Sequence, residues 1–241
     1  MEMEIAADRP PPLGYLSTFG WAVLSGIAST IASIILLVAM YGDRIVGLGD
    51  LTGDGKVFSL VLIISTVAQV GVLALAIRRT GWPVAEYLGL CAPGTREAAI
   101  AFVVFAAYVL GSDALTYLMG RDIVTPFQAD IFRTARDTGT IWLMWVAVVL
   151  VGPAGEEIMF RGFLHRGWAR PPRLVAPAIF VISALWSILH IQYDWYGILQ
   201  IFVGGLLLGW VRWRSGSTLL TFLLHGAMNA WATIETTLAL A

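Results

Sequence analysis

Long apolar segments constrain this chain more than any other feature, because about 20 consecutive apolar residues can cross the hydrocarbon core of a bilayer as one helix. A segment in lipid must satisfy its backbone hydrogen bonds internally, so each such segment predicts a helix. We expect an all-α fold, a polytopic membrane helical bundle of about seven transmembrane helices, forming a single domain over residues 1–241. The apolar segments lie at residues 18–40, 57–77, 98–118, 140–162, 174–191, 197–213 and 217–238.

The composition fits the same interpretation. Charged residues make up 13% of the chain and hydrophobic residues 58%, whereas a soluble domain has about 25% charged residues. The net charge of −1 gives no electrostatic basis for binding nucleic acid, so we expect the lipid bilayer as the surroundings and no nucleic-acid partner. The single cysteine, Cys91, excludes an internal disulfide framework and a metal cluster built on cysteines.

Lys and Arg are distributed unevenly between the two ends of the predicted helices. The N-terminus and the loops after the second, fourth and sixth segments hold ten of them, and the opposite side holds five. Because cytoplasmic loops are enriched in Lys and Arg, we expect a multi-pass protein with its N-terminus in the cytoplasm and its C-terminus outside.

The connection at residues 125–138, "TPFQADIFRTARDT", has a pattern of its own. Thr125 and Gln128 are spaced for a helix-capping box, with Pro126 suited to the first turn. The stretch therefore predicts a short helix, with Phe127, Ile131 and Ala135 along one apolar side. Such a helix can lie at the membrane interface or serve as a solvated connector, and the sequence leaves both open.

Ionisable groups inside apolar segments are rare here and are the first candidates for a functional site, because each costs about 2.5–3.5 kcal/mol to insert. In "LVGPAGEEIMFRGFLHR", Glu157 and Arg161 are four residues apart, so they share a helix face and can pair. Glu156 lies about 100° further round the helix. Pro153 comes just before the glutamates and should bend this segment, which would leave room for water.

Two later segments also carry polar side chains at helical spacing. "ALWSILHIQ" puts Trp186 and His190 on one face, and "LLTFLLHGAMNAW" does the same for His225 and Asn229. These groups can converge with the glutamates inside the membrane.

Each group also has a purely structural reading. The glutamates and Arg161 could form a charged helix end, and each histidine or Asn229 could be a hydrogen-bonded contact between membrane helices. A non-catalytic membrane immunity or scaffold protein, or a small proton-coupled transporter, is therefore the alternative to an enzyme. Transporters often contain internal repeats, and none is visible in this sequence.

Three motifs, in order, resemble those of a known family. "EEIMFR" fits E-E-x-x-x-R, "WSILH" is similar to F-x-x-x-H with Trp186 in place of Phe, and "HGAMN" fits H-x-x-x-N. Together they resemble the CAAX-protease and bacteriocin-processing, or Abi, family of intramembrane proteases, which includes type 2 CAAX prenyl proteases. The resemblance covers a catalytic core at about residues 140–235 and implies an endopeptidase acting on a membrane-associated protein or peptide.

The resemblance also implies roles for the motif residues. Glu156 would be the general base that activates water, helped by His190, while His225 and Asn229 would stabilise the oxyanion. Glu157, Arg161 and Trp186 would be supporting residues, and Arg161 could also meet a carboxylate of the substrate. Rhomboid and H-E-x-x-H proteases fit poorly, because neither a G-x-S nucleophile on an apolar segment nor that zinc motif is present.

Relatives of this kind have been described both as glutamate-dependent and as zinc enzymes. We prefer no resident metal, because Glu156 as a metal ligand would no longer be the most suitable base. If zinc is bound, its ligands would be Glu156, His190 and His225, with water in the fourth position.

Overall fold

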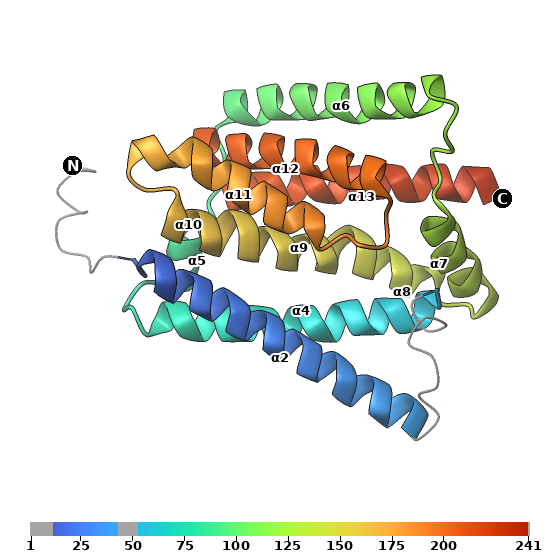
Figure 1. Ribbon diagram of the computed structural model, residues 1–241, viewed down its shortest axis with the longest axis horizontal. Coiled ribbons are helices and arrows are strands. Elements are labelled where there is room, and N and C mark those ends of the chain that lie inside the picture. Colours follow the sequence, from blue (N-terminus) through green and yellow to red (C-terminus); the bar gives the residue numbers. More distant parts are fainter. Residues whose placement is uncertain (1–11, 43–52, 241) are drawn as a thin grey trace.

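The computed structural model describes residues 12–42 and 53–240, which form a bundle of helices with no strand in these ranges (Figure 1). This confirms the predicted all-α class. Helices cover all seven expected segments: α2 (Tyr15–Tyr41), α4 (Gly55–Arg78), α6 (Thr95–Leu118), a composite helix over Ile141–Trp168, α11 (Val175–Ile188), α12 (Trp195–Ser215) and α13 (Thr218–Leu240). The short helices are α5 (Val84–Leu88), α7 (Pro126–Asp137) and a 3₁₀ turn at Pro172–Leu174.

Five helices in the described ranges are long and apolar enough to cross a membrane: α2, α4, α6, Ile141–Trp168 and α12. The apolar helix at Pro172–Ile188 is shorter. The helix α13 covers the seventh expected segment but is not among these five. The chain is thus an integral membrane protein with a helical bundle, while the count of seven spans stays a prediction. The sixth segment is longer than expected, since α12 extends over 21 residues.

The outer surface of the bundle is apolar. On α2, Ile27, Ile31, Ile34 and Ile35 are each at least half exposed, a pattern that is unfavourable in water but suits contact with lipid.

The composite helix lies in the middle of the bundle (Figure 1). Its α9 segment (Gly152–Glu157) contacts α4 and α13. On the other side α11 and α12 pack closely: a Cβ atom on Gly205 would come within 3.0 Å of Ser183 and Trp186, and one on Gly209 within 2.7 Å of Ile179. The G-x-x-x-G of α12 is therefore a helix contact, and it sets the position of Trp186.

The predicted helix after residue 125 is α7, and its capping box is present. Thr125 Oγ1 accepts from the Gln128 N–H at 3.3 Å, and Gln128 Oε1 accepts from the Thr125 N–H at 2.8 Å. Its apolar side does not face outward, because Ile131 and Ala135 are buried in a cluster with Met144 of α8 (Ile141–Trp145) and Phe58 of α4. The apolar side of α7 thus packs against one end of the bundle.

Candidate active site

The glutamates lie on a helix that departs from regular α geometry. Residues Val146–Val151 and Ile158–Leu164 are π-helical, and α9 lies between them. Before Pro153 the chain widens, so that the Gly152 N–H bonds to Ala147 O, five residues back. π-Helical turns are rare and occur frequently at functional sites. The sequence predicted a bend at Pro153 but not the two π-helical stretches.

Glu157 and Arg161 form the ion pair predicted from their spacing. Arg161 Nη1 donates to Glu157 Oε1 at 2.8 Å, and both side chains are fully buried. The guanidinium also donates from Nη2 to Gly205 O at 3.3 Å, which links the pair to α12. Arg212 Nε donates in turn to Arg161 O at 3.0 Å. A pair this deep is stable only while both charges remain compensated.

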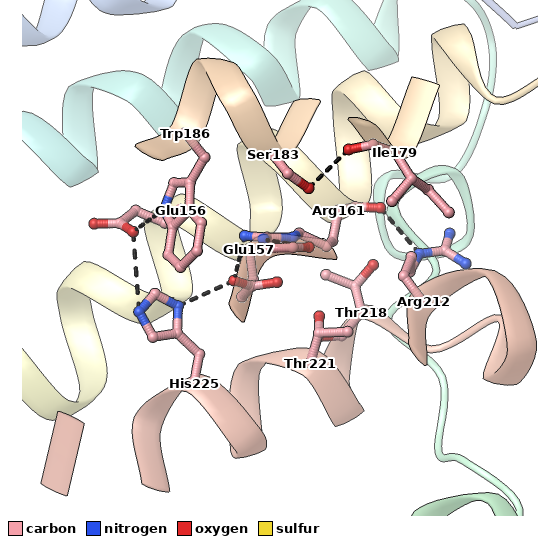
Figure 2. Close-up of polar contacts among 12 residues, drawn as sticks. Glu156, Glu157, Arg161, Ile179, Ser183, Trp186, Arg212, Thr218, Thr221 and His225 are labelled. Atoms are coloured by element: carbon pink, nitrogen blue, oxygen red, sulfur yellow. Dashed lines mark hydrogen bonds and ion pairs between the residues drawn. The ribbon is translucent and has the colours of Figure 1, made fainter. Parts of the chain in front are cut away.

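His225 of α13 lies between the two glutamates (Figure 2). Its Nδ1 is 3.0 Å from Glu157 Oε1, and its Nε2 is 4.0 Å from Glu156 Oε2. Because a carboxylate paired with arginine only accepts hydrogen bonds, Nδ1 is the donor to Glu157. This leaves Nε2 facing Glu156. The sequence did not predict the contact between Glu157 and His225.

Trp186 of α11 contacts the same group of side chains. Its Nε1 donates to Glu156 Oε2 at 2.5 Å (Figure 2). Its ring meets those of His190 and His225 edge to face, with centroids 5.2 and 5.3 Å apart, and the Arg161 guanidinium lies 4.4 Å from the ring centroid. Phenylalanine, which the F-x-x-x-H pattern has here, cannot donate the hydrogen bond.

His190 and Asn229 are held by main-chain carbonyls. His190 Nδ1 lies 2.9 Å from Trp186 O and must donate to it, which leaves Nε2 free. Asn229 Nδ2 donates to Val148 O, in the first π-helical stretch, at 2.9 Å. One amide N–H of Asn229 therefore remains for another partner.

The predicted site residues meet at one cavity. Glu156, Trp186, His190, His225 and Asn229 all line a space of about 280 Å³, and the rest of its wall is largely apolar. The Glu156 side chain is 31% exposed, whereas that of Glu157 is inaccessible. Of the two carboxylates, only Glu156 can meet water or a substrate.

Tyr193, which the motif pattern did not indicate, lines the same cavity. It follows α11 in a turn closed by a 3.1 Å hydrogen bond from its N–H to His190 O. Burial, and to a smaller extent the nearby Glu156 carboxylate, raises the pKa of Tyr193 to about 12. The phenol therefore keeps its proton throughout the physiological range. A tyrosine three residues after a motif histidine is a weak signal in one sequence.

The two histidines of the site share one feature with zinc ligands. His190 and His225 each donate from Nδ1 to an oxygen of the protein and leave Nε2 without a hydrogen-bond partner, as histidines that bind zinc commonly do. In the described part of the chain, however, no three His, Cys, Asp or Glu side chains are grouped closely enough to hold a metal ion. As placed, these residues do not form a zinc site.

Residues 138–231 match the family described as Type II CAAX prenyl endopeptidase Rce1-like. The match includes every motif residue from Glu156 to Asn229, and it confirms the resemblance drawn from the three motifs. At the level of the family it indicates a membrane protease with a peptide or protein substrate. No curated protein and no solved structure matches the chain.

Proposed function

Since residues 138–231 carry the match to the Rce1-like type II CAAX endopeptidases, we propose that this chain is an intramembrane endopeptidase in which Glu156 activates the attacking water. It acts as a single membrane domain over residues 1–241, with its catalytic core at about residues 140–235 and its N-terminus in the cytoplasm.

One observation carries this proposal: Glu156 is a partly exposed carboxylate at the wall of an otherwise largely apolar cavity, with Trp186 and His225 on either side of it. The indole N–H occupies Oε2, so the other oxygen, Oε1, is left to accept from a water molecule. A base fixed in this way meets the geometric requirement for general-base catalysis.

The chemistry follows from these positions. The water oxygen attacks the carbonyl carbon of the scissile peptide while Glu156 takes one of its protons, with His190 as a second hydrogen-bonding group for the water. The electron pair of the C=O bond moves to the oxygen, where Asn229 donates its remaining N–H and where His225 stabilises the charge in the form that carries a proton on Nε2 as well. When the C–N bond breaks, the proton held by Glu156 passes to the leaving nitrogen, so the products are a carboxylate and an amine.

Glu157 and Arg161 support this chemistry without touching the substrate. Arg161 pairs with Glu157 and holds it in a position where it accepts from His225 Nδ1. The ring is thereby held with Nε2 toward Glu156. The motif resemblance also allowed Arg161 to contact a carboxylate of the substrate. We favour the supporting role, because the guanidinium of Arg161 is buried and already paired with Glu157.

The substrate is a membrane-associated protein or peptide. Apolar side chains such as Phe58, Leu62 and Phe127 line the cavity beyond Glu156, which favours a cleavage site with apolar neighbours. The reaction is glutamate-dependent with no resident metal, because a metal on Glu156 would remove its use as a base.

The test is hydrolysis by the purified protein in proteoliposomes. Membrane-anchored peptides, prenylated and non-prenylated, are incubated in ¹⁸O-labelled water, and the masses of the products are measured by mass spectrometry. We expect one ¹⁸O atom in the new carboxyl end with wild-type protein and with Glu97→Gln, an exposed glutamate at the start of α6. Proton movement across the vesicles without any cleavage would contradict the proposal and favour a transporter.

A further inference from the structure

The three motif residues His225, His190 and Asn229 have most of their hydrogen-bond donors committed to the protein. His225 Nδ1 donates to Glu157, His190 Nδ1 to Trp186 O, and one amide N–H of Asn229 to Val148 O. In its neutral form each imidazole then presents only an acceptor at Nε2. An oxyanion needs donors, so of these three residues only Asn229 has an N–H left when both histidines are neutral.

Tyr193 can supply a further hydrogen-bond donor. Its side chain lines the cavity that holds Glu156, and its hydroxyl makes no hydrogen bond to any residue within 12–42 and 53–240. The Tyr193 side chain thus brings to the wall of this cavity an O–H donor that has no hydrogen-bond partner among the described residues, and it lies near enough to feel the charge of Glu156.

The ring of Tyr193 is also held in place. It lies nearly parallel to the His190 ring, with centroids 6.4 Å apart, and the ring of Phe127 meets it at 77° with centroids 5.9 Å apart. The turn that joins Tyr193 to His190 fixes the backbone. A donor held by the fold loses little entropy when it binds a developing charge.

From this geometry we infer that Tyr193 is a further catalytic residue, whose phenol donates a hydrogen bond to the scissile carbonyl oxygen as that oxygen becomes negative. The inference rests on the proposed function. The phenol keeps its proton, so the balance of the hydrolysis is unchanged: water supplies the oxygen, and Glu156 carries the proton to the leaving amine.

The test is steady-state kinetics of Tyr193→Phe on a cleaved peptide. This change removes one oxygen and keeps the ring that packs on His190 and Phe127. Since loss of one oxyanion donor costs about 10²–10³ in kcat, we expect kcat to fall by about a hundredfold with KM nearly unchanged. The matched control is Tyr196→Phe, where the lost hydroxyl contacts Thr116 and Gln200 outside the cavity; it should keep the wild-type kcat.

The outcomes separate this inference from the proposed function. If Tyr193→Phe has the kcat of Tyr196→Phe while Glu156→Gln is inactive, the inference is wrong and the proposed function stands. If the kcat of Tyr193→Phe falls only in proportion to the loss of folded protein, measured by thermal unfolding, the residue has a packing role and the inference is also overturned. If the wild-type protein hydrolyses no peptide, the proposed function is overturned and the inference with it.

Discussion

Trp186 joins the two sides of the candidate active site: its Nε1 donates to Glu156 Oε2 at 2.5 Å, and its carbonyl oxygen accepts from His190 Nδ1 at 2.9 Å. One residue thus orients both the proposed base and its neighbouring imidazole. The main-chain contact is independent of the residue type, whereas the contact to Glu156 requires an indole.

Trp186→Phe restores the F-x-x-x-H pattern. It removes the indole donor to Glu156 and keeps both an aromatic ring and the main-chain contact to His190. A hydrogen bond to a charged group contributes about 1.5–3 kcal/mol, so we expect kcat to fall by about ten- to a hundredfold while the protein stays folded. The control is Trp168→Phe, which removes an indole bond to Tyr15 O far from the cavity. Equal kcat values for the two variants would show that the indole N–H does not orient Glu156.

Arg161→Ala should reduce membrane abundance as well as activity, because it leaves the buried Glu157 carboxylate without its guanidinium partner. Breaking a buried ion pair costs about 3–5 kcal/mol. The double variant Glu157→Gln/Arg161→Gln should recover part of the abundance, since it removes both charges. Its activity should stay low, because His225 loses the carboxylate that accepts from Nδ1.

Quantitative immunoblotting of membranes measures these levels. Arg133→Ala, at an exposed arginine of α7, is the control and should match wild type. Equal levels of the wild type, Arg161→Ala and the double variant would contradict the proposed dependence of folding on this pair.

The helices and the pairing within them could be predicted because they depend on local spacing. Apolar segment length places every long helix, and the four-residue separation of Glu157 and Arg161 predicts an ion pair that is confirmed at 2.8 Å. The capping box at Thr125 is equally local.

Contacts between helices could not be predicted in the same way. The bond from His225 to Glu157 and that from Trp186 to Glu156 depend on how α13 and α11 are rotated against the composite helix. Periodicity within one segment does not determine that rotation. The two π-helical stretches also change the angular spacing along residues 146–164, which a constant 3.6-residue period cannot represent.

The orientation in the membrane is a separate prediction. Reporter fusions after residues 94 and 170 should be cytoplasmic. Fusions after residues 52 and 241, which lie beyond the described ranges, should be outside. The physical basis is the excess of Lys and Arg on one side. A cytoplasmic signal from the C-terminal fusion would show that the number of spans is even, and would point to residues 191–213 as the error.

Metal dependence gives the fourth prediction. Purified protein should contain well under one zinc per chain and should keep its activity after thorough chelation, because Glu156 serves as base. Elemental analysis and a chelation series measure both quantities. Stoichiometric zinc, with activity lost on chelation and restored by zinc, would instead make Glu156, His190 and His225 the ligands.

The most direct test of the account is the turnover of Glu156→Gln, measured with purified protein and a substrate cleaved by the wild type. Glutamine keeps the size of the side chain and removes the base, and the partial exposure of this site should allow normal expression. General-base catalysis contributes about 10²–10⁴ in rate, so the account predicts a kcat lower by about a thousandfold with wild-type yield. A Glu156→Gln enzyme that retains near wild-type turnover would contradict it.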